Sequence, residues 1–227
     1  EDSLGSNVYV DDSETWATRV HWNPLDTADA TVYLGAWAFH EKIPAGASGV
    51  GGSSAIAGHF NDLVRITPGT LVGAERSTAY GAELAGFFGP AWATGEWGTR
   101  SLRGADASGR YDRDHEAWAI SAGWFLAGAL PSYSGKAGTW GKVKVADPVT
   151  RGGSGAWELK GRYEDVDYAE LPSGGTGHAW TLGANWYLND FSRVMFEAVR
   201  WQTRHRSGSA AGRDEGTTFN TRLQLVF

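Results

Sequence analysis

The chain has 227 residues, a formal net charge of -6 and no cysteine, so it offers neither a disulfide framework nor thiolate chemistry, and its charge argues against a nucleic-acid partner. Its mean hydropathy is -0.35, and no stretch approaches the roughly 20 continuous apolar residues that a membrane-spanning helix needs. The 12 Trp, 8 Tyr and 9 Phe residues, beside 32 Gly, instead suit short alternating strands with aromatic residues at a membrane interface.

Nine segments alternate between apolar and polar residues with the period of two that is typical of β-strands. In chain order they are 14–22, 30–40, 77–88, 91–100, 116–128, 156–167, 178–188, 193–201 and 217–227. A closed barrel satisfies every backbone hydrogen bond in lipid without helices. The pattern therefore predicts an all-β fold, an antiparallel transmembrane β-barrel, with residues 1–227 as one domain.

The connections between these segments differ in length. Tight turns are predicted at 23–29, 89–90 and 189–192, and surface loops at 41–73, 101–115 and 202–216. In outer-membrane barrels the short turns are periplasmic and the long loops extracellular. The connection at 129–154 is long although parity places it on the periplasmic side, so either it folds inward or the strand count is off at this point.

The last segment resembles the close of a bacterial outer-membrane β-barrel. Phe219, Leu223 and Phe227 fall on one face, whereas Asn220 and Arg222 fall on the other. Single-chain barrels of this kind have an even number of strands and both termini in the periplasm. Nine strands that end there must begin on the extracellular side, so we expect a piece of a longer protein, truncated at its N-terminal side. Its first strand would be an unpaired edge, which closed barrels avoid.

Several stretches carry a family resemblance that is close in the second half of the chain and looser in the first. Three of them read Gly155-Ala-Trp-Glu-Leu-Lys-Gly-Arg-Tyr163, Thr181-Leu-Gly-Ala-Asn-Trp-Tyr-Leu-Asn189 and Arg193-Val-Met-Phe-Glu-Ala-Val-Arg200. Others are Ser121-Ala-Gly-Trp-Phe-Leu126, Gly138-Thr-Trp-Gly-Lys-Val-Lys144 and the terminal Thr221-Arg-Leu-Gln-Leu-Val-Phe227. In this order they resemble the closing part of the phosphate-selective porin O and P family.

The resemblance implies a sixteen-stranded, homotrimeric porin in contact with the lipid of the bacterial outer membrane. It also implies passive diffusion of phosphate or polyphosphate anions, with no cofactor. The nine strands would be the last nine of sixteen, in agreement with the parity of the termini. Members of the family line the pore with an arginine ladder and with lysines near the mouth and the constriction, and much of that ladder would precede these strands.

An anion channel needs fixed positive charge on its lumen face, and the planar fork of arginine suits phosphate. The cations that alternation places on the lumen face are Arg19, Lys160, Arg162 and Arg222, with His21 as a pH-dependent addition. If 129–154 folds inward, Lys142, Lys144 and Arg151 join them.

Acidic residues share the same face, which leaves a second interpretation open. Glu158 and Glu164 alternate with Lys160 and Arg162, and Glu83, Glu96 and Glu197 are also predicted to face inward. Opposite charges would then pair into a neutral wall, as in a porin of different or broad selectivity. The alternative from another class is a soluble β-sandwich that binds glycans through its Trp residues.

The Trp residues favour the membrane interpretation. Those predicted to face lipid near strand ends are Trp16, Trp22, Trp157, Trp180 and Trp186. The positions of Trp37, Trp92 and Trp140 stay open, and one of them could line the pore. No enzyme is predicted, because His115-Glu116 lacks the second His of a zinc-binding helix and neither a GxSxG elbow nor a Walker loop is present.

Overall fold

The computed structural model describes residues 13–44, 54–56, 65–67, 69–127, 129, 132–134, 139–208 and 211–226. Nine long strands dominate it, namely β1 (Glu14–Asp26), β2 (Ala30–Lys42), β5 (Ala74–Phe88), β6 (Ala91–Asp106), β7 (Gly109–Ala127), β10 (Ala156–Asp167), β11 (Gly175–Asn189), β12 (Ser192–His205) and β13 (Gly212–Leu225). The nine predicted strands are confirmed, several with longer bounds. Phe227, on which the predicted last strand ends, lies outside the described residues.

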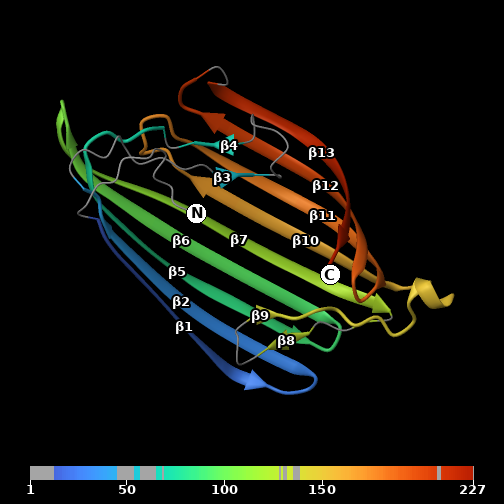
Figure 1. Cartoon of the computed structure of the whole chain (residues 1–227). Coiled ribbons are helices and arrows are strands. Elements are labelled where there is room, and N and C mark those ends of the chain that lie inside the picture. Colours follow the sequence, from blue (N-terminus) through green and yellow to red (C-terminus); the bar gives the residue numbers. More distant parts are fainter. Residues whose placement is uncertain are drawn as a thin grey trace.

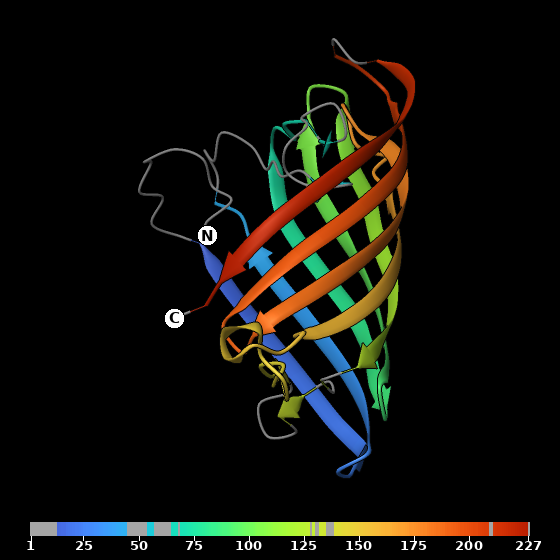
Figure 2. The same cartoon turned by 90° about the vertical axis from the view of Figure 1, so that its right-hand side faces the viewer.

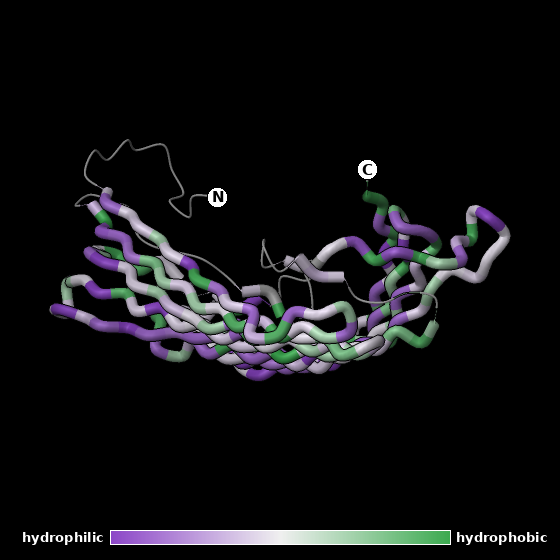
Figure 3. Tube along the Cα trace, turned by 90° about the horizontal axis from the view of Figure 1, so that it is seen from below, coloured by the Kyte–Doolittle hydropathy of each residue, from purple (hydrophilic) through white to green (hydrophobic). Residues whose placement is uncertain are grey.

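The nine strands form one antiparallel sheet with the order β1-β2-β5-β6-β7-β10-β11-β12-β13, so each pairs with its neighbours along the chain. The sheet bends into an open trough, with β1 and β13 as its edges (Figures 1 and 2). Viewed from below it is an arc with connecting segments on its concave side (Figure 3). The β-sandwich alternative is wrong, because the described residues contain no second large sheet to pack against this one.

The two ends of the trough differ in their connections. Tight turns at 27–29, 89–90 and 190–191 define what we call the lower end, and the opposite end is the upper end (Figure 2). Directly opposed residues of neighbouring strands share a face of the sheet, so the register places each side chain on the concave or the convex face. One such row, from His21 through Glu83 and Glu96 to Glu164, is concave.

Two belts of aromatic side chains cross the convex face. The upper belt consists of Tyr80, Trp97, Trp118, Tyr163 and Trp180, and the lower belt of Phe88, Trp124, Trp157 and Trp186. Within the upper belt the rings of Tyr163 and Trp180 lie 4.5 Å apart, and in the lower belt Trp157 stacks on Trp186 at 5.5 Å. Such belts sit at the two surfaces of a bilayer.

The sequence did not assign Trp37, Trp92 and Trp140 to a face of the sheet, and the structure assigns two of them. Trp37 and Trp92 lie on the concave face, because they are opposed to Arg19 and Gly123 respectively. The side chain of Trp140 lies outside the described residues. Trp16 and Trp22, which were predicted to face lipid, are exposed on the convex face.

The prediction of a surface loop at 101–115 is wrong. β6 and β7 continue as a ladder up to the pair Asp106 and Gly109, with a two-residue turn between them. The charges of this stretch stabilise the pairing, since Arg103 donates to Asp112 at 2.8 Å across the hairpin. Charge in a strand that extends beyond the membrane therefore does not indicate a loop.

The loop predicted at 202–216 is also shorter than expected. β12 runs to His205 and β13 begins at Gly212. Arg200 on β12 donates to Glu215 on β13 at 2.9 Å, so the polar residues again serve cross-strand pairing.

The connection between β2 and β5 folds onto the upper concave face. β3 (Ser54–Ala55) and β4 (Arg65–Ile66) form a short ladder. Ile56 and Ile66 are fully buried, in a cluster with Val166, Ala179, Val199 and Trp201. A Cβ atom at Gly177 would lie 2.2 Å from Ile56 Cδ1, so a larger residue there would displace the Ile56 side chain from this close approach. For the described part of 41–73 the prediction of a surface loop is wrong, because its isoleucines find an apolar partner inside the trough.

The connection between β7 and β10 folds onto the lower concave face, which decides between the two readings of 129–154. We call the described residues of 132–146 the inward segment; β8 (Tyr133–Ser134) and β9 (Thr139–Trp140) belong to it. Val145 packs in a cluster with Phe125, Ala156 and Tyr187. The Tyr133 hydroxyl accepts a hydrogen bond from Asn23 Nδ2 at 3.0 Å, so the segment reaches from β10 and β11 across to β1.

Helical structure is minor. The short 3-10 helix η2 (Val149–Arg151) follows the inward segment and projects beyond the lower strand ends (Figure 1). In the part of the chain that the structure describes, no helix has the length and apolar character needed to cross a membrane.

Candidate functional site

The concave face carries most of the predicted lumen cations, and three of them, Arg19, Lys160 and Arg162, contact a carboxylate. Arg19 on β1 donates to Glu83 Oε2 on β5 at 2.6 Å and to the Tyr33 hydroxyl on β2 at 2.8 Å. Tyr33 donates to the same carboxylate at 2.5 Å, and the His21 ring stacks on the Tyr33 ring at 5.9 Å. The positive charge of Arg19 is therefore neutralised locally.

The other mid-wall cations are paired in the same way. Lys160 Nζ donates to Glu197 Oε1 at 2.7 Å, although β10 and β12 are separated by β11. Gly183 stands between them in the register and has no side chain to block the contact. Arg162 donates to Glu164 at 3.0 Å and lies 3.4 Å from the Ser121 hydroxyl. The middle of this wall is close to neutral.

One carboxylate of the middle wall has no cationic partner. Glu96 is exposed on the concave face, and within the described ranges it forms neither an ion pair nor a side-chain hydrogen bond. It lines a hollow of about 310 Å³ together with Glu83, Arg162 and Glu164. An anion that passes here meets both signs of charge.

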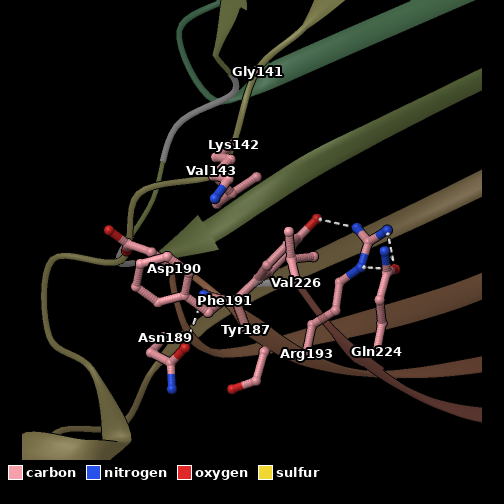
Figure 4. Close-up of a pocket in the computed structure, with 11 residues that line it drawn as sticks. Gly141, Lys142, Val143, Tyr187, Asn189, Asp190, Phe191, Arg193, Gln224 and Val226 are labelled. Atoms are coloured by element: carbon pink, nitrogen blue, oxygen red, sulfur yellow. Dashed lines mark hydrogen bonds between the residues drawn. The ribbon is translucent and has the colours of Figure 1, made fainter.

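The lower end of the concave face has a different composition, which Figure 4 shows in close-up. Arg193 at the start of β12 donates Nε and Nη2 to Gln224 Oε1 at 3.0 and 2.8 Å, and Nη1 to the Tyr187 hydroxyl at 3.1 Å. Lys142 of the inward segment shares this pocket of about 250 Å³ and lies 4.9 Å from the centre of the Phe191 ring. Neither cation is ion-paired with a carboxylate among the described residues, so both are available to an anion.

Arg193 is a site residue that sequence reasoning did not single out. It has the same parity on its strand as Glu197, which was predicted to face inward, so the alternation contained the signal. Its availability depends on Gln224 and Tyr187, and these contacts cannot be read from a single strand.

A buried carboxylate fixes the floor beneath this pocket. Glu158 is 3% exposed and accepts hydrogen bonds from Trp92 Nε1 at 2.6 Å, Asn185 Nδ2 at 2.6 Å and the Tyr187 hydroxyl at 2.7 Å. Trp92 lies flat over Gly123, where a Cβ atom would be 2.5 Å from the indole. The network positions Tyr187, and through it Arg193.

The remaining predicted cations lie apart from one another. Arg222 on β13 is exposed on the concave face opposite Met195. Lys144 is exposed in the inward segment and lines a larger hollow at the lower end. Arg151 is exposed on η2, beyond the strand ends. The structure thus brings Lys142 to Arg193, and it separates Arg19, Lys160 and Arg162 into individual ion pairs.

A curved antiparallel meander with two aromatic belts outside and charged residues inside is the wall of a porin-type β-barrel. The family model for phosphate-selective porin O and P matches residues 5–227, and the chain belongs to this family. Porin O of Pseudomonas aeruginosa is 29% identical over 160 residues, which cover 66% of this chain and 35% of that relative. The aligned part therefore spans about a third of the relative's length.

Proposed function

We propose that this chain forms part of the wall of an outer-membrane porin through which anions, phosphate or polyphosphate among them, diffuse passively. The family assignment and the name of the relative, Porin O, support this class. By the usual placement of short turns, the lower end is periplasmic. The family resemblance also predicts a homotrimeric assembly. Measuring the mass of the native protein in detergent would test this prediction.

The observation that carries the proposal is the pocket of Lys142 and Arg193 at the lower end. A cation that already contacts a carboxylate must give up that contact before it binds an anion. Lys142 and Arg193 need not do so, because their contacts are the Phe191 ring, Gln224 and Tyr187. Asp190 also lines this pocket, but its carboxylate accepts from Val145 N at 2.7 Å and forms no ion pair with either cation among the described residues. An anion leaving the trough would meet two cations and one carboxylate here, and a weak binding site of this kind permits release.

The proposal is tested by single-channel recording of the native protein in planar bilayers. We expect the reversal potential in a chloride gradient to have the sign of an anion-selective pore, and phosphate to reduce the chloride current in a saturable manner. Cation selectivity, or chloride current that is insensitive to phosphate, would contradict it.

A porin with broad selectivity is the second candidate, and the mid-wall ion pairs together with Glu96 favour it. The same recording separates the two, because a neutral wall gives a reversal potential near zero in the chloride gradient. Phosphate would then permeate without a saturable effect on chloride.

Glu96 offers a test of how the acids of this wall act. We expect Glu96→Gln to make the pore more anion-selective, because it removes an exposed negative charge that no described cation compensates. The measure is the shift in reversal potential, which should shrink at high salt, where charges are screened. Thr94→Val, two residues away on the same face, is the control and should leave the reversal potential unchanged. An equal shift in both variants would show that the charge of Glu96 is not responsible.

A further inference from the structure

The convex face contains a hollow between the two aromatic belts. Gly86, Ala93, Ala122 and Gly161 are opposed to one another on the neighbouring strands β5, β6, β7 and β10. Larger side chains flank this row of small residues, among them Leu84, Ile120 and Tyr163 above and Phe88 below. The result is a hollow of about 720 Å³ whose side chains are almost entirely apolar.

Three arginines lie beside and above one end of this hollow. Trp180 lines the hollow, and Arg200 is opposed to it on the next strand, one strand spacing of about 4.8 Å away. Arg204 follows on the same face of β12 and is opposed to Arg213 on β13.

The three arginines carry more charge than their acidic neighbour compensates. Glu215 accepts from Arg200 at 2.9 Å and from Arg213 at 2.9 Å. Arg204 is exposed and is ion-paired with no described residue. Arg200 is level with the upper belt, and Arg204 and Arg213 lie above it, towards the level of lipid headgroups. Glu215 is the carboxylate that contacts them among the described residues, and Asp167 lies two strands from Arg204 in the same row without an ion pair to it, so positive charge is in excess on β12 and β13.

We propose that this surface binds one phosphorylated lipid of the outer leaflet, with an acyl chain in the hollow and a phosphate on Arg200, Arg204 and Arg213. The apolar hollow lies between the belts, where a bilayer has its hydrocarbon, and the arginines lie at the upper end, where a bilayer has its phosphates. A phosphorylated lipid would therefore meet both features in the correct order. Arginine pairs with phosphate through parallel charge-assisted hydrogen bonds. A second copy of the chain would have to present an acidic and an apolar surface in this same order.

The test is native mass spectrometry of the native protein in mild detergent, titrated with lipid A that carries two phosphates. In the double variant Arg204→Gln/Arg213→Gln we expect affinity to fall about tenfold, since two charge-assisted contacts are removed. Lipid A stripped of its phosphates should bind the unmodified protein about tenfold more weakly as well, and the double variant should weaken it no further. Ala122→Phe, which fills the hollow, should weaken both lipids.

Matched controls lie on the same face. Ala82→Phe is on the convex face outside the hollow, and Arg110→Gln is an outward arginine near the hairpin tip; both should bind lipid A normally. Equal affinity for the two lipids, or unchanged binding by Ala122→Phe, would overturn the proposal. So would a change in subunit number without a change in lipid binding, which would identify the face as a subunit contact. This test is independent of the proposed porin function, because every residue that it changes faces away from the trough. A pore that proved not to be anion-selective would therefore leave the lipid-binding result unchanged.

Discussion

Replacing Glu158 with alanine is expected to cause a large loss of stability in the concave wall. The substitution leaves Trp92 Nε1, Asn185 Nδ2 and the Tyr187 hydroxyl without their common acceptor. Glu158 is 3% exposed, so water cannot readily replace the carboxylate. An unsatisfied buried donor costs ~1–3 kcal/mol, and because three donors that relax together are not additive we expect a total of about 3–5 kcal/mol.

The same change should loosen the inward segment. Tyr187 packs with Val145, and Glu158 holds the Tyr187 hydroxyl in place. When that hydroxyl is released, Arg193 loses one of its two supporting groups. We therefore expect the Glu158→Ala pore to show noisier single-channel current as well as a lower midpoint of heat-induced unfolding on gels.

Glu197→Ala is the matched control for this stability prediction. Among the described residues its carboxylate contacts Lys160 only, and both side chains are partly exposed. Solvent-screened pairs of this kind contribute about 1 kcal/mol or less. If the unfolding midpoints of Glu158→Ala and Glu197→Ala fall by the same amount, the three-donor network does not stabilise the wall as argued.

Strand alternation was sufficient to predict the nine strands and the face on which most charges lie. The reason is physical: a strand between lipid and an aqueous lumen must alternate, and a one-residue slip would place every charge in lipid. Lys160 and Arg162 are inward for this reason. The connections were predicted less well, because the charged residues 101–115 lie beyond the membrane, where a strand need not be apolar.

Pairing within the wall could not be predicted from one strand. Sequence suggested that Lys160 would meet Glu158 or Glu164, its neighbours two and four residues away. In the structure Lys160 contacts Glu197 across Gly183, and Glu158 is turned into a buried network. Both outcomes depend on the register of three strands and on the inward segment that covers them, which are tertiary properties.

Replacing Arg193 with glutamine is expected to weaken phosphate binding at the lower end, which the proposed function makes periplasmic, about tenfold, the effect of removing one strong charge-assisted contact. Arginine has five N–H donors, and three are used on Gln224 and Tyr187, which leaves two for an anion. Those same contacts hold the guanidinium in one orientation before an anion arrives, so little freedom is lost on binding.

Phosphate added to either side of a single channel measures this effect. We expect Arg193→Gln to weaken block from the periplasmic side more than block from the extracellular side, because its pocket lies at the lower end. Arg193→Lys should recover part of the affinity, since it restores the charge without the planar fork. Arg151→Gln removes an exposed arginine at the same end, on η2 beyond the strands, and should change nothing. If Arg151→Gln weakens block as much as Arg193→Gln does, phosphate responds to the overall charge of the periplasmic end. The fixed geometry of Arg193, Gln224 and Tyr187 would then have no part in recognition.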